Sequence, residues 1–199
     1  MTETFFMQLS HDVVLDLETQ NTFQDVGSRD PAALSLSLVG VYTYADDTFR
    51  TYMEEDLPKL WPVLEHADRI IGFNHRHFDM PILKRYYRGD CLRFPLLDIM
   101  EEAQRVLGYR PSLNDIASAT LHTQKSGHGL DAIRYWKEKN IEKLAQYCLD
   151  VVRITRDVYE YGKKNGTLLC AERFGTPKTI PVDFSVTTVK TAVNLTLGL

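Results

Sequence analysis

The sequence has few cysteines, no long apolar run and no excess of positive charge. Its three cysteines are odd in number and widely spaced (Cys91, Cys148 and Cys170), which excludes a disulfide framework and the paired spacing typical of a zinc site. No apolar stretch reaches the length of a membrane span, and the N-terminus lacks the basic and apolar segments of a signal peptide. We therefore expect a cytoplasmic protein that makes no contact with membranes.

The lack of positive charge also limits how the protein could bind nucleic acid. A formal net charge of −4 argues against a protein that holds nucleic acid by bulk electrostatic attraction. An enzyme that reaches phosphate through bound metal ions can still be acidic. The hydrophobic content of 44% and charged content of 25% are those of an ordinary globular domain. We predict a single domain over residues 1–199, with a core over about 10–166 and a C-terminal extension over 167–199 whose role the sequence does not indicate.

Hydrophobic periodicity predicts strands first and then helices interleaved with strands. We predict strands over residues 12–18, 34–44, 48–53 and 69–73, and a short one that ends at Asp98. We predict helices over residues 57–67, 99–106, 112–120, 130–137 and 141–161, and another that begins near Asp79. Gly162 is interpreted as the end of the longest helix. This order of elements predicts an α/β fold with a mixed β-sheet flanked by α-helices.

The first strand carries two carboxylates within an apolar segment. Asp16 and Glu18 are two positions apart, so their side chains point to the same face of a strand. Two ionised carboxylates at that spacing repel each other, and a bound cation relieves the repulsion. Hard oxygen ligands favour magnesium or manganese. The alternative interpretation is a strand end or solvated face that binds no metal.

Two further acidic stretches follow along the chain. Asn74 and Asp79 come after a predicted buried strand, and Tyr147 and Asp150 lie in the long late helix. Each has an ordinary interpretation when taken alone. Asn74 suits a turn, Asp79 suits the start of a helix, and Asp150 suits a solvated helix face. The order and spacing of the whole set are more specific than any one of its members.

Together these residues resemble the motifs of the DEDD superfamily of 3′–5′ exonucleases, over residues 12–162. The closest similarity is to a bacterial group of ribonuclease H-like exonucleases, some of which occur with helicase domains. The resemblance implies a ribonuclease H-like fold and two divalent ions, Mg²⁺ or Mn²⁺, in a two-metal displacement. It implies a substrate of single-stranded DNA or RNA 3′ ends, and it makes a helicase a possible partner.

The resemblance also implies a role for each matching residue. Asp16 would bridge both metal ions, Glu18 would bind the ion that activates water, and Asp79 would reach the second ion. On the late helix, Tyr147 would orient the attacking water and Asp150 would be the fourth ligand. Residues expected to contact substrate are Thr19, Asn74 and Phe78.

One position departs from the family pattern. In the tyrosine-containing branch the last acid follows the tyrosine by four residues, and here that position is Val151. Asp150 follows Tyr147 by three residues, so Asp150 and Val151 point about 100° apart on a helix. Val151 lies on the apolar stripe of the helix and Asp150 at the edge of that stripe. Either Asp150 reaches the metal ions or the fourth ligand is missing.

Three functions follow from these alternatives. The first is a metal-dependent 3′–5′ exonuclease, with Asp16, Glu18, Asp79, Tyr147 and Asp150 in the site. The second is an impaired or non-catalytic nucleic-acid-binding module with the same fold, and the third is a protein-interaction domain that serves a helicase. Aromatic side chains that could stack on bases in either of the first two are Tyr42, Tyr44, Tyr86, Tyr87 and Trp136.

Overall fold

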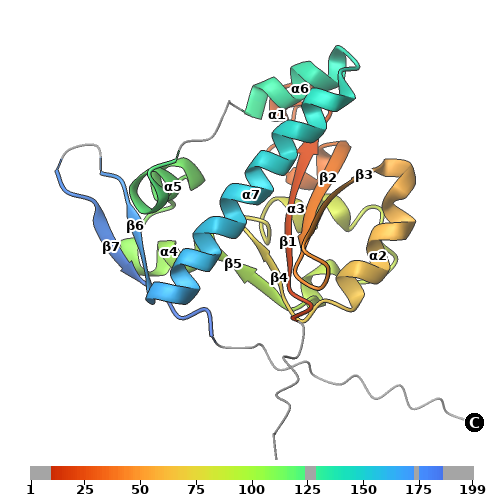
Figure 1. The fold of residues 1–199 in the computed structure, drawn as a ribbon. Helices are drawn as coiled ribbons and strands as arrows, with labels where there is room; N and C mark the ends of the chain where they lie inside the picture. The colour runs from red at the N-terminus through yellow and green to blue at the C-terminus, as the bar shows by residue number, and fades with distance from the viewer. Residues whose placement is uncertain (1–9, 124–128, 173–174, 186–199) are drawn as a thin grey trace, which may run out of the picture.

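A five-stranded mixed sheet organises the protein (Figure 1). The computed structural model describes residues 10–123, 129–172 and 175–185. The strands are β1 (Val13–Thr19), β2 (Leu36–Thr43), β3 (Thr48–Met53), β4 (Ile70–Gly72) and β5 (Leu96–Asp98), in the order β3-β2-β1-β4-β5. The central strand β1 is antiparallel to β2 and parallel to β4. The predicted α/β fold with a mixed sheet is therefore confirmed.

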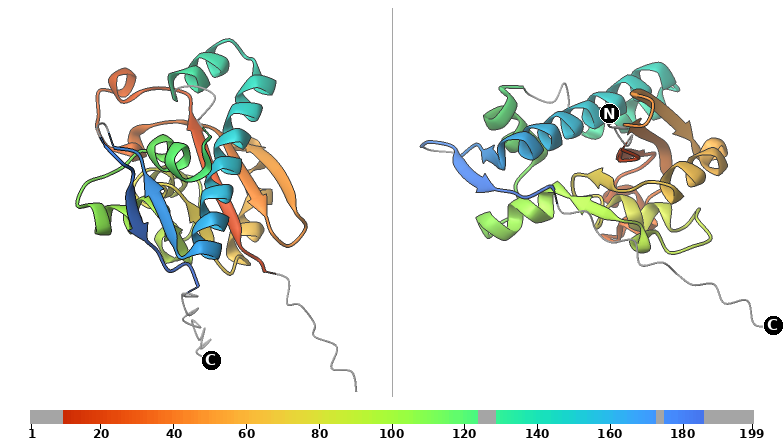
Figure 2. Two further views of the ribbon diagram at one scale, coloured as in Figure 1. Left: turned by 60° about the vertical axis from the view of Figure 1, so that its left-hand side comes forward. Right: turned by 60° about the horizontal axis from the view of Figure 1, so that its bottom comes forward.

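Helices cover both faces of this sheet, as Figures 1 and 2 show. The helices are α1 (Phe23–Val26), α2 (Leu57–Glu65), α3 (Asp79–Leu83), α4 (Ile99–Leu107), α5 (Leu113–Leu121), α6 (Gly129–Lys137) and α7 (Ile141–Asn165). The helix predicted to begin near Asp79 is the short α3, and sequence periodicity did not predict the short α1. Within the described ranges, no helix combines the length and the apolar character that a bilayer crossing needs.

Strand β1 supplies apolar side chains to two separate cores. Val13, Leu15 and Leu17 belong to the core that includes α2 and α3, whereas Val14 belongs to the core beneath α4 to α7. Because side chains alternate along a strand, Asp16 and Glu18 follow Val14 on the α7 side. Burial on both faces explains why β1 is almost continuously apolar apart from these two acids.

Helix α7 lies unusually close to the sheet beside Asp16. Gly40 of β2 pairs with Asp16 across the sheet. A Cβ atom at Gly40 would lie 2.7 Å from Sγ of Cys148 and 3.1 Å from a methyl carbon of Val152. The glycine is therefore needed for this approach, which brings Cys148 next to the acidic part of β1.

The prediction that Gly162 ends the long helix is wrong. Helix α7 continues to Asn165 and is capped by Gly166 in the left-handed conformation, with φ 66°. Gly162 is instead buried within α7, where a Cβ atom would lie 2.4 Å from a ring carbon of Phe184. A requirement for close packing, which sequence periodicity does not reveal, explains this glycine.

A hairpin after α7 packs against the main domain. Strands β6 (Thr167–Cys170) and β7 (Lys178–Pro181) form a separate two-stranded antiparallel sheet. Leu168, Ile180 and Phe184 are buried in the same core as α7. The carbonyl oxygen of Phe184 also accepts a hydrogen bond of 2.6 Å from the buried Arg69 guanidinium. The chain therefore remains part of the packed core through Phe184.

Candidate metal centre

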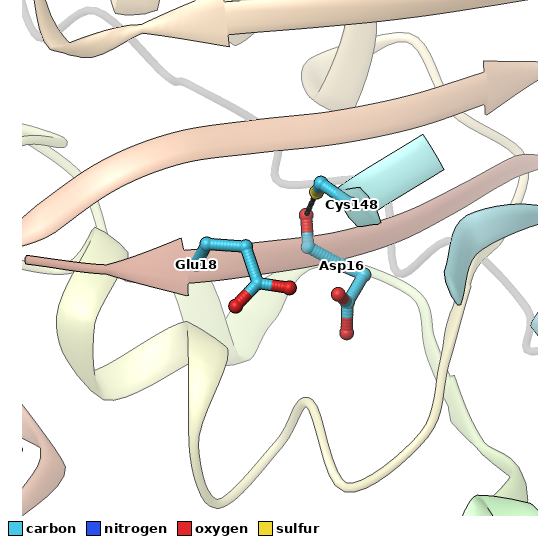
Figure 3. Close-up of side chains that lie close together, drawn as sticks. All are labelled: Asp16, Glu18 and Cys148. Carbon is cyan, nitrogen blue, oxygen red and sulfur yellow. Dashed lines mark hydrogen bonds between the residues drawn. The ribbon is translucent and has the colours of Figure 1, made fainter. Parts of the chain in front are cut away.

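The carboxylates of Asp16 and Glu18 lie together beside α7, as Figure 3 shows. Both side chains are half-buried and leave β1 on the same face. One oxygen of each carboxylate and Sγ of Cys148 all lie within 4.8 Å of one another. Three potential ligand atoms at this spacing could surround one metal ion.

Cys148 joins this group, although the spacing of the cysteines in the sequence indicated no metal-binding role. Its thiol donates a hydrogen bond of 3.7 Å to the backbone carbonyl of Asp16. Burial, followed by the charges of Asp16 and Glu18, raises the pKa of the Cys148 thiol well above its usual value. A cysteine binds metal as the thiolate, and a raised pKa disfavours the thiolate. The carboxylate oxygens are therefore the favoured metal ligands at this site. Such a donor set suits Mg²⁺ or Mn²⁺ better than zinc.

Asp79 brings a third carboxylate to the same place. It is 3% exposed at the start of α3. The pairing of β1 with β4 ends at Val14, and further along β1 the Leu17 N–H donates to Oδ1 of Asp79 at 3.1 Å. Because Leu17 lies between Asp16 and Glu18, this bond fixes Asp79 beside both acids. Burial raises the pKa of Asp79 well above its usual value, and the charge of Asp16 raises it further.

A buried aspartate at the end of β5 holds the turn that precedes α3. Asp98 accepts hydrogen bonds from the N–H groups of Asn74 at 2.7 Å, Arg76 at 3.0 Å and Met100 at 3.1 Å. Asn74 has a left-handed backbone with φ 64°, and Arg110 donates a hydrogen bond to its side-chain oxygen. The sequence prediction used Asp98 only as a strand end. An acid directly before a helix is also a capping signal, and that signal could have identified its role.

His75 completes the support of this turn. It is fully buried, and its Nδ1 lies 3.4 Å from Oδ2 of Asp98. Gly72 leaves room for the ring, because a Cβ atom there would lie 2.6 Å from Cγ of His75. Burial alone would raise the pKa of Asp98, but the neighbouring His75 ring and hydrogen bonds from backbone N–H groups hold it below its usual value.

A pocket of about 440 Å³ opens over the three acids. It contains six residues that the sequence predicted for the site: Asp16, Glu18, Thr19, Asn74, Phe78 and Asp79. Its apolar lining includes Phe73, Phe78, Leu130 and Ile133. Among the described residues that line it there is no lysine, arginine or histidine. The pocket thus places an acidic cluster beside an apolar wall.

The two predicted site residues on α7 lie outside the lining of this pocket. Tyr147 is 5% exposed and belongs to the core beneath α7. Asp150 is half-buried and accepts a hydrogen bond of 2.8 Å from the side chain of Gln146. Val151 is 2% exposed in the core, so the predicted inward position of Val151 is confirmed. Helix α7 approaches the acids through Cys148.

Comparisons with known proteins agree with this architecture. A solved structure that resembles the chain is the family B DNA polymerase from the hyperthermophilic archaeon Pyrobaculum calidifontis, with a TM-score of 0.59 and 18% sequence identity. The similarity covers 76% of this chain and 24% of the polymerase chain, so this protein spans about a quarter of that polymerase. No curated protein matches the chain.

The family assignment comes from the sequence match. The model of the RNase_H superfamily matches residues 13–162, from the first residue of β1 into the last turn of α7. This range includes all five strands of the main sheet and the three acids of the pocket. With this match over most of its length, the chain belongs to the RNase_H superfamily.

Proposed function

We propose that this protein is a metal-dependent 3′–5′ exonuclease that hydrolyses phosphodiester bonds at single-stranded DNA or RNA ends. The observation that carries the proposal is the meeting of Asp16, Glu18 and Asp79 in one pocket, where burial and then the charge of Asp16 raise the pKa of Asp79. Carboxylates that lie close enough to raise one another's pKa favour binding of divalent cations. Membership of the RNase_H superfamily supports a nuclease.

The donor set of the pocket fits the proposed metal ions. Asp16, Glu18 and Asp79 offer carboxylate oxygens, and burial and then the charges of Asp16 and Glu18 raise the pKa of the Cys148 thiol beside them. Bound divalent ions would activate water for attack on phosphorus and stabilise the leaving 3′ oxygen. Asp16 would contribute ligands to both ions, and Glu18 and Asp79 would each contribute to one. The hydrogen bond from Leu17 to Asp79 holds the third acid in place before any cation binds.

The rest of the pocket suits a terminal nucleotide. Phe73, Phe78, Leu130 and Ile133 give an apolar surface beside the acids, on which the sugar and base can pack while the phosphate faces the carboxylates. Asn74 also lines the pocket, and its backbone is held there by the hydrogen bond from its N–H to Asp98. A volume of about 440 Å³ is within the usual range for small-ligand sites. This size favours removal of single terminal nucleotides over cleavage within a duplex.

The positions of Asp150 and Val151 on α7 favour a second function, an impaired nuclease that mainly binds nucleic acid. Asp150 is engaged with Gln146 and lies outside the pocket lining, and the family's acidic position is the buried Val151. The roles of Asp150 as fourth ligand and Tyr147 in orienting water stay predictions. A helicase partner also stays a prediction, which co-purification from the source cells would test.

The test is an assay with single-stranded DNA and RNA labelled at the 5′ end, with Mg²⁺ or Mn²⁺. We expect products that shorten stepwise from the 3′ end, and no products in EDTA. Asp16→Asn, purified in the same way, controls for contaminating nucleases. Internal cleavage products would refute the exonuclease assignment. Tight binding of the strands without cleavage in either metal would establish the binding module instead.

A further inference from the structure

A second hollow, of opposite charge, adjoins the pocket over Asp16, Glu18 and Asp79. We call that acidic pocket the metal pocket, in line with the proposed function. The second hollow has a volume of about 590 Å³ and is lined by Gln20, Asn21, Trp136, Lys137, Lys139 and Ile141. We call these six residues the lysine–tryptophan groove. Asn21 lines both hollows, so the groove continues from the metal pocket. The described lining of the groove contains two lysines and no acid, whereas that of the pocket contains three acids and no cation.

The backbone at Lys139 is held in a conformation that lysine does not favour. Lys139 has φ 57°, which places it in the left-handed region that glycine adopts most easily. Its N–H donates to the Trp136 carbonyl at 2.9 Å, and the next N–H, of Asn140, donates to the Tyr135 carbonyl at 2.8 Å. These two bonds form the usual glycine-ended helix cap. A lysine here costs stability relative to glycine, and it fixes a positive charge at the groove.

Trp136 and Lys137 add an aromatic ring and a second positive charge to the groove. Trp136 is half-buried at the end of α6, so its ring is anchored by the core while part of it faces the groove. The Lys137 ammonium lies 4.0 Å from the Asp25 carboxylate, and both side chains are largely exposed. A solvated pair at that distance is weak and leaves Lys137 able to contact an anion. An anchored indole and two cations that line the same groove are suited to binding single-stranded nucleic acid.

We propose that the lysine–tryptophan groove binds the single strand that leads into the metal pocket. A base stacks on Trp136, and backbone phosphates contact Lys137 and Lys139. Asn21, which lines both hollows, lies where the groove meets the pocket. The inference rests on the proposed function for the direction of the strand, since the terminal nucleotide is placed at the acids. The stacking surface and the two cations do not depend on cleavage.

The test measures binding in EDTA, where no cleavage is expected, with labelled single-stranded DNA and RNA in parallel. Trp136→Ala should weaken binding about tenfold, with little change in its salt dependence. Lys139→Gly should also weaken binding, and the slope of log affinity against log salt should fall by about 0.7, the value for one phosphate contact. The matched control is Lys164→Ala, an exposed lysine near the other end of α7, which should change neither quantity.

Thermal melting separates a loss of contact from a loss of folding. Lys139→Gly should melt at the same temperature as the parent protein or higher, because glycine relieves the left-handed strain. If Lys139→Gly binds more weakly although it is at least as stable as the parent protein, then Lys139 contacts the nucleic acid. The comparison of DNA with RNA identifies the substrate: it is the nucleic acid whose binding is weakened by Trp136→Ala.

The outcomes also distinguish this proposal from the proposed function. The groove assignment is overturned if the parent protein binds neither DNA nor RNA, or if Trp136→Ala and Lys139→Gly both bind like the parent. It is also overturned if the control Lys164→Ala lowers affinity as much as Lys139→Gly. Nuclease activity could persist in each of these cases. Groove-dependent binding by a parent protein that cleaves nothing would support the groove and refute the exonuclease.

Discussion

Asp79 and Asp98 are equally buried, but the protein treats their charges in opposite ways. Each is 3% exposed and lies near the end of a parallel strand of the same sheet. Asp98 accepts three backbone N–H bonds and contacts His75, and its pKa is lowered. Asp79 accepts the Leu17 N–H and faces negative neighbours, and its pKa is raised.

The difference shows how a structural acid is distinguished from one that is suited to a cation. Burial disfavours the charge of both residues. Around Asp98 the protein itself supplies the compensating hydrogen bonds, so the ionised carboxylate stabilises the turn at Asn74. Around Asp79 the nearest charges increase the cost of ionisation, and a divalent cation would reverse this effect. The same substitution at the two positions should therefore have different consequences.

The largest expected difference is in catalysis. Asp79→Asn should lower kcat/KM for a single-stranded substrate about a thousandfold, because loss of a metal ligand removes several kcal/mol of transition-state stabilisation. Asp98→Asn should lower it much less, since Asp98 acts on the site only through the turn at Asn74. The measurement is kcat/KM in saturating Mg²⁺ for both variants at a temperature where both are folded. Equal losses would show that Asp98 is part of the reaction centre.

The next largest effect is on stability. Asp98→Asn should lower the free energy of unfolding by about 3 kcal/mol at pH 7, because it weakens several charge-assisted hydrogen bonds to a buried group. For a domain of this size that lowers Tm by roughly 6–12 °C. The exposed helix-capping residue Asp90, which accepts one bond from the Leu92 N–H, provides the control. Asp90→Asn should cost far less.

This loss should depend on pH in a defined direction. The pKa of Asp98 is lowered in the folded protein from 3.8, so its ionised form contributes stability above that pH. The contribution disappears as pH falls through the lower folded pKa. The difference between parent and Asp98→Asn in urea unfolding should therefore be full at pH 7 and shrink as the pH falls below 3.8. A difference that grew in acid would contradict the assignment.

A smaller effect is expected where a carboxylate is added to α7. Val151→Asp should raise cleavage in Mg²⁺ about tenfold if the fourth ligand is missing, which corresponds to roughly 1.4 kcal/mol of barrier. The same change places a charge in the core and should destabilise the metal-free protein. Asp150→Asn is the companion measurement. A loss of activity there as large as that of Asp79→Asn would identify Asp150 as the ligand already in use.

Local patterns predicted most of the fold and much of the pocket. Alternation along β1 placed Asp16 and Glu18 on one face, which is a consequence of strand geometry that sequence spacing reflects. Asn74, Phe78 and Asp79 were assigned to the site through the resemblance to the DEDD exonucleases, whose motif spacing they match. The helical stripe also placed Val151 inward.

Features that depend on contact between distant segments could not be predicted. Cys148 meets Asp16 because Gly40, on another strand, allows α7 to approach. Gly162 was interpreted as a helix end because its contact, Phe184, lies 22 positions later along the chain and in another element. The lysine–tryptophan groove combines the end of β1 with the turn between α6 and α7. Sequence spacing carries no information on which such faces meet.

The smallest expected effect completes the comparison of the two buried acids. In EDTA, Asp79→Asn should change the free energy of unfolding by only about 1 kcal/mol, in the stabilising direction, which raises Tm by about 2–4 °C. The amide oxygen can still accept the Leu17 N–H, while the repulsion from Asp16 is removed. Because the folded pKa of Asp79 is raised above 3.8, protonation supports the parent fold fully below that pH, and this support is lost as pH rises through the folded pKa. The gain of the variant should therefore be absent near pH 4 and increase toward alkaline pH, opposite in sign to the effect of Asp98→Asn. Melting curves of both variants across pH, with and without Mg²⁺, measure this. A gain that persists unchanged when Mg²⁺ is added would show that no cation neutralises the pocket.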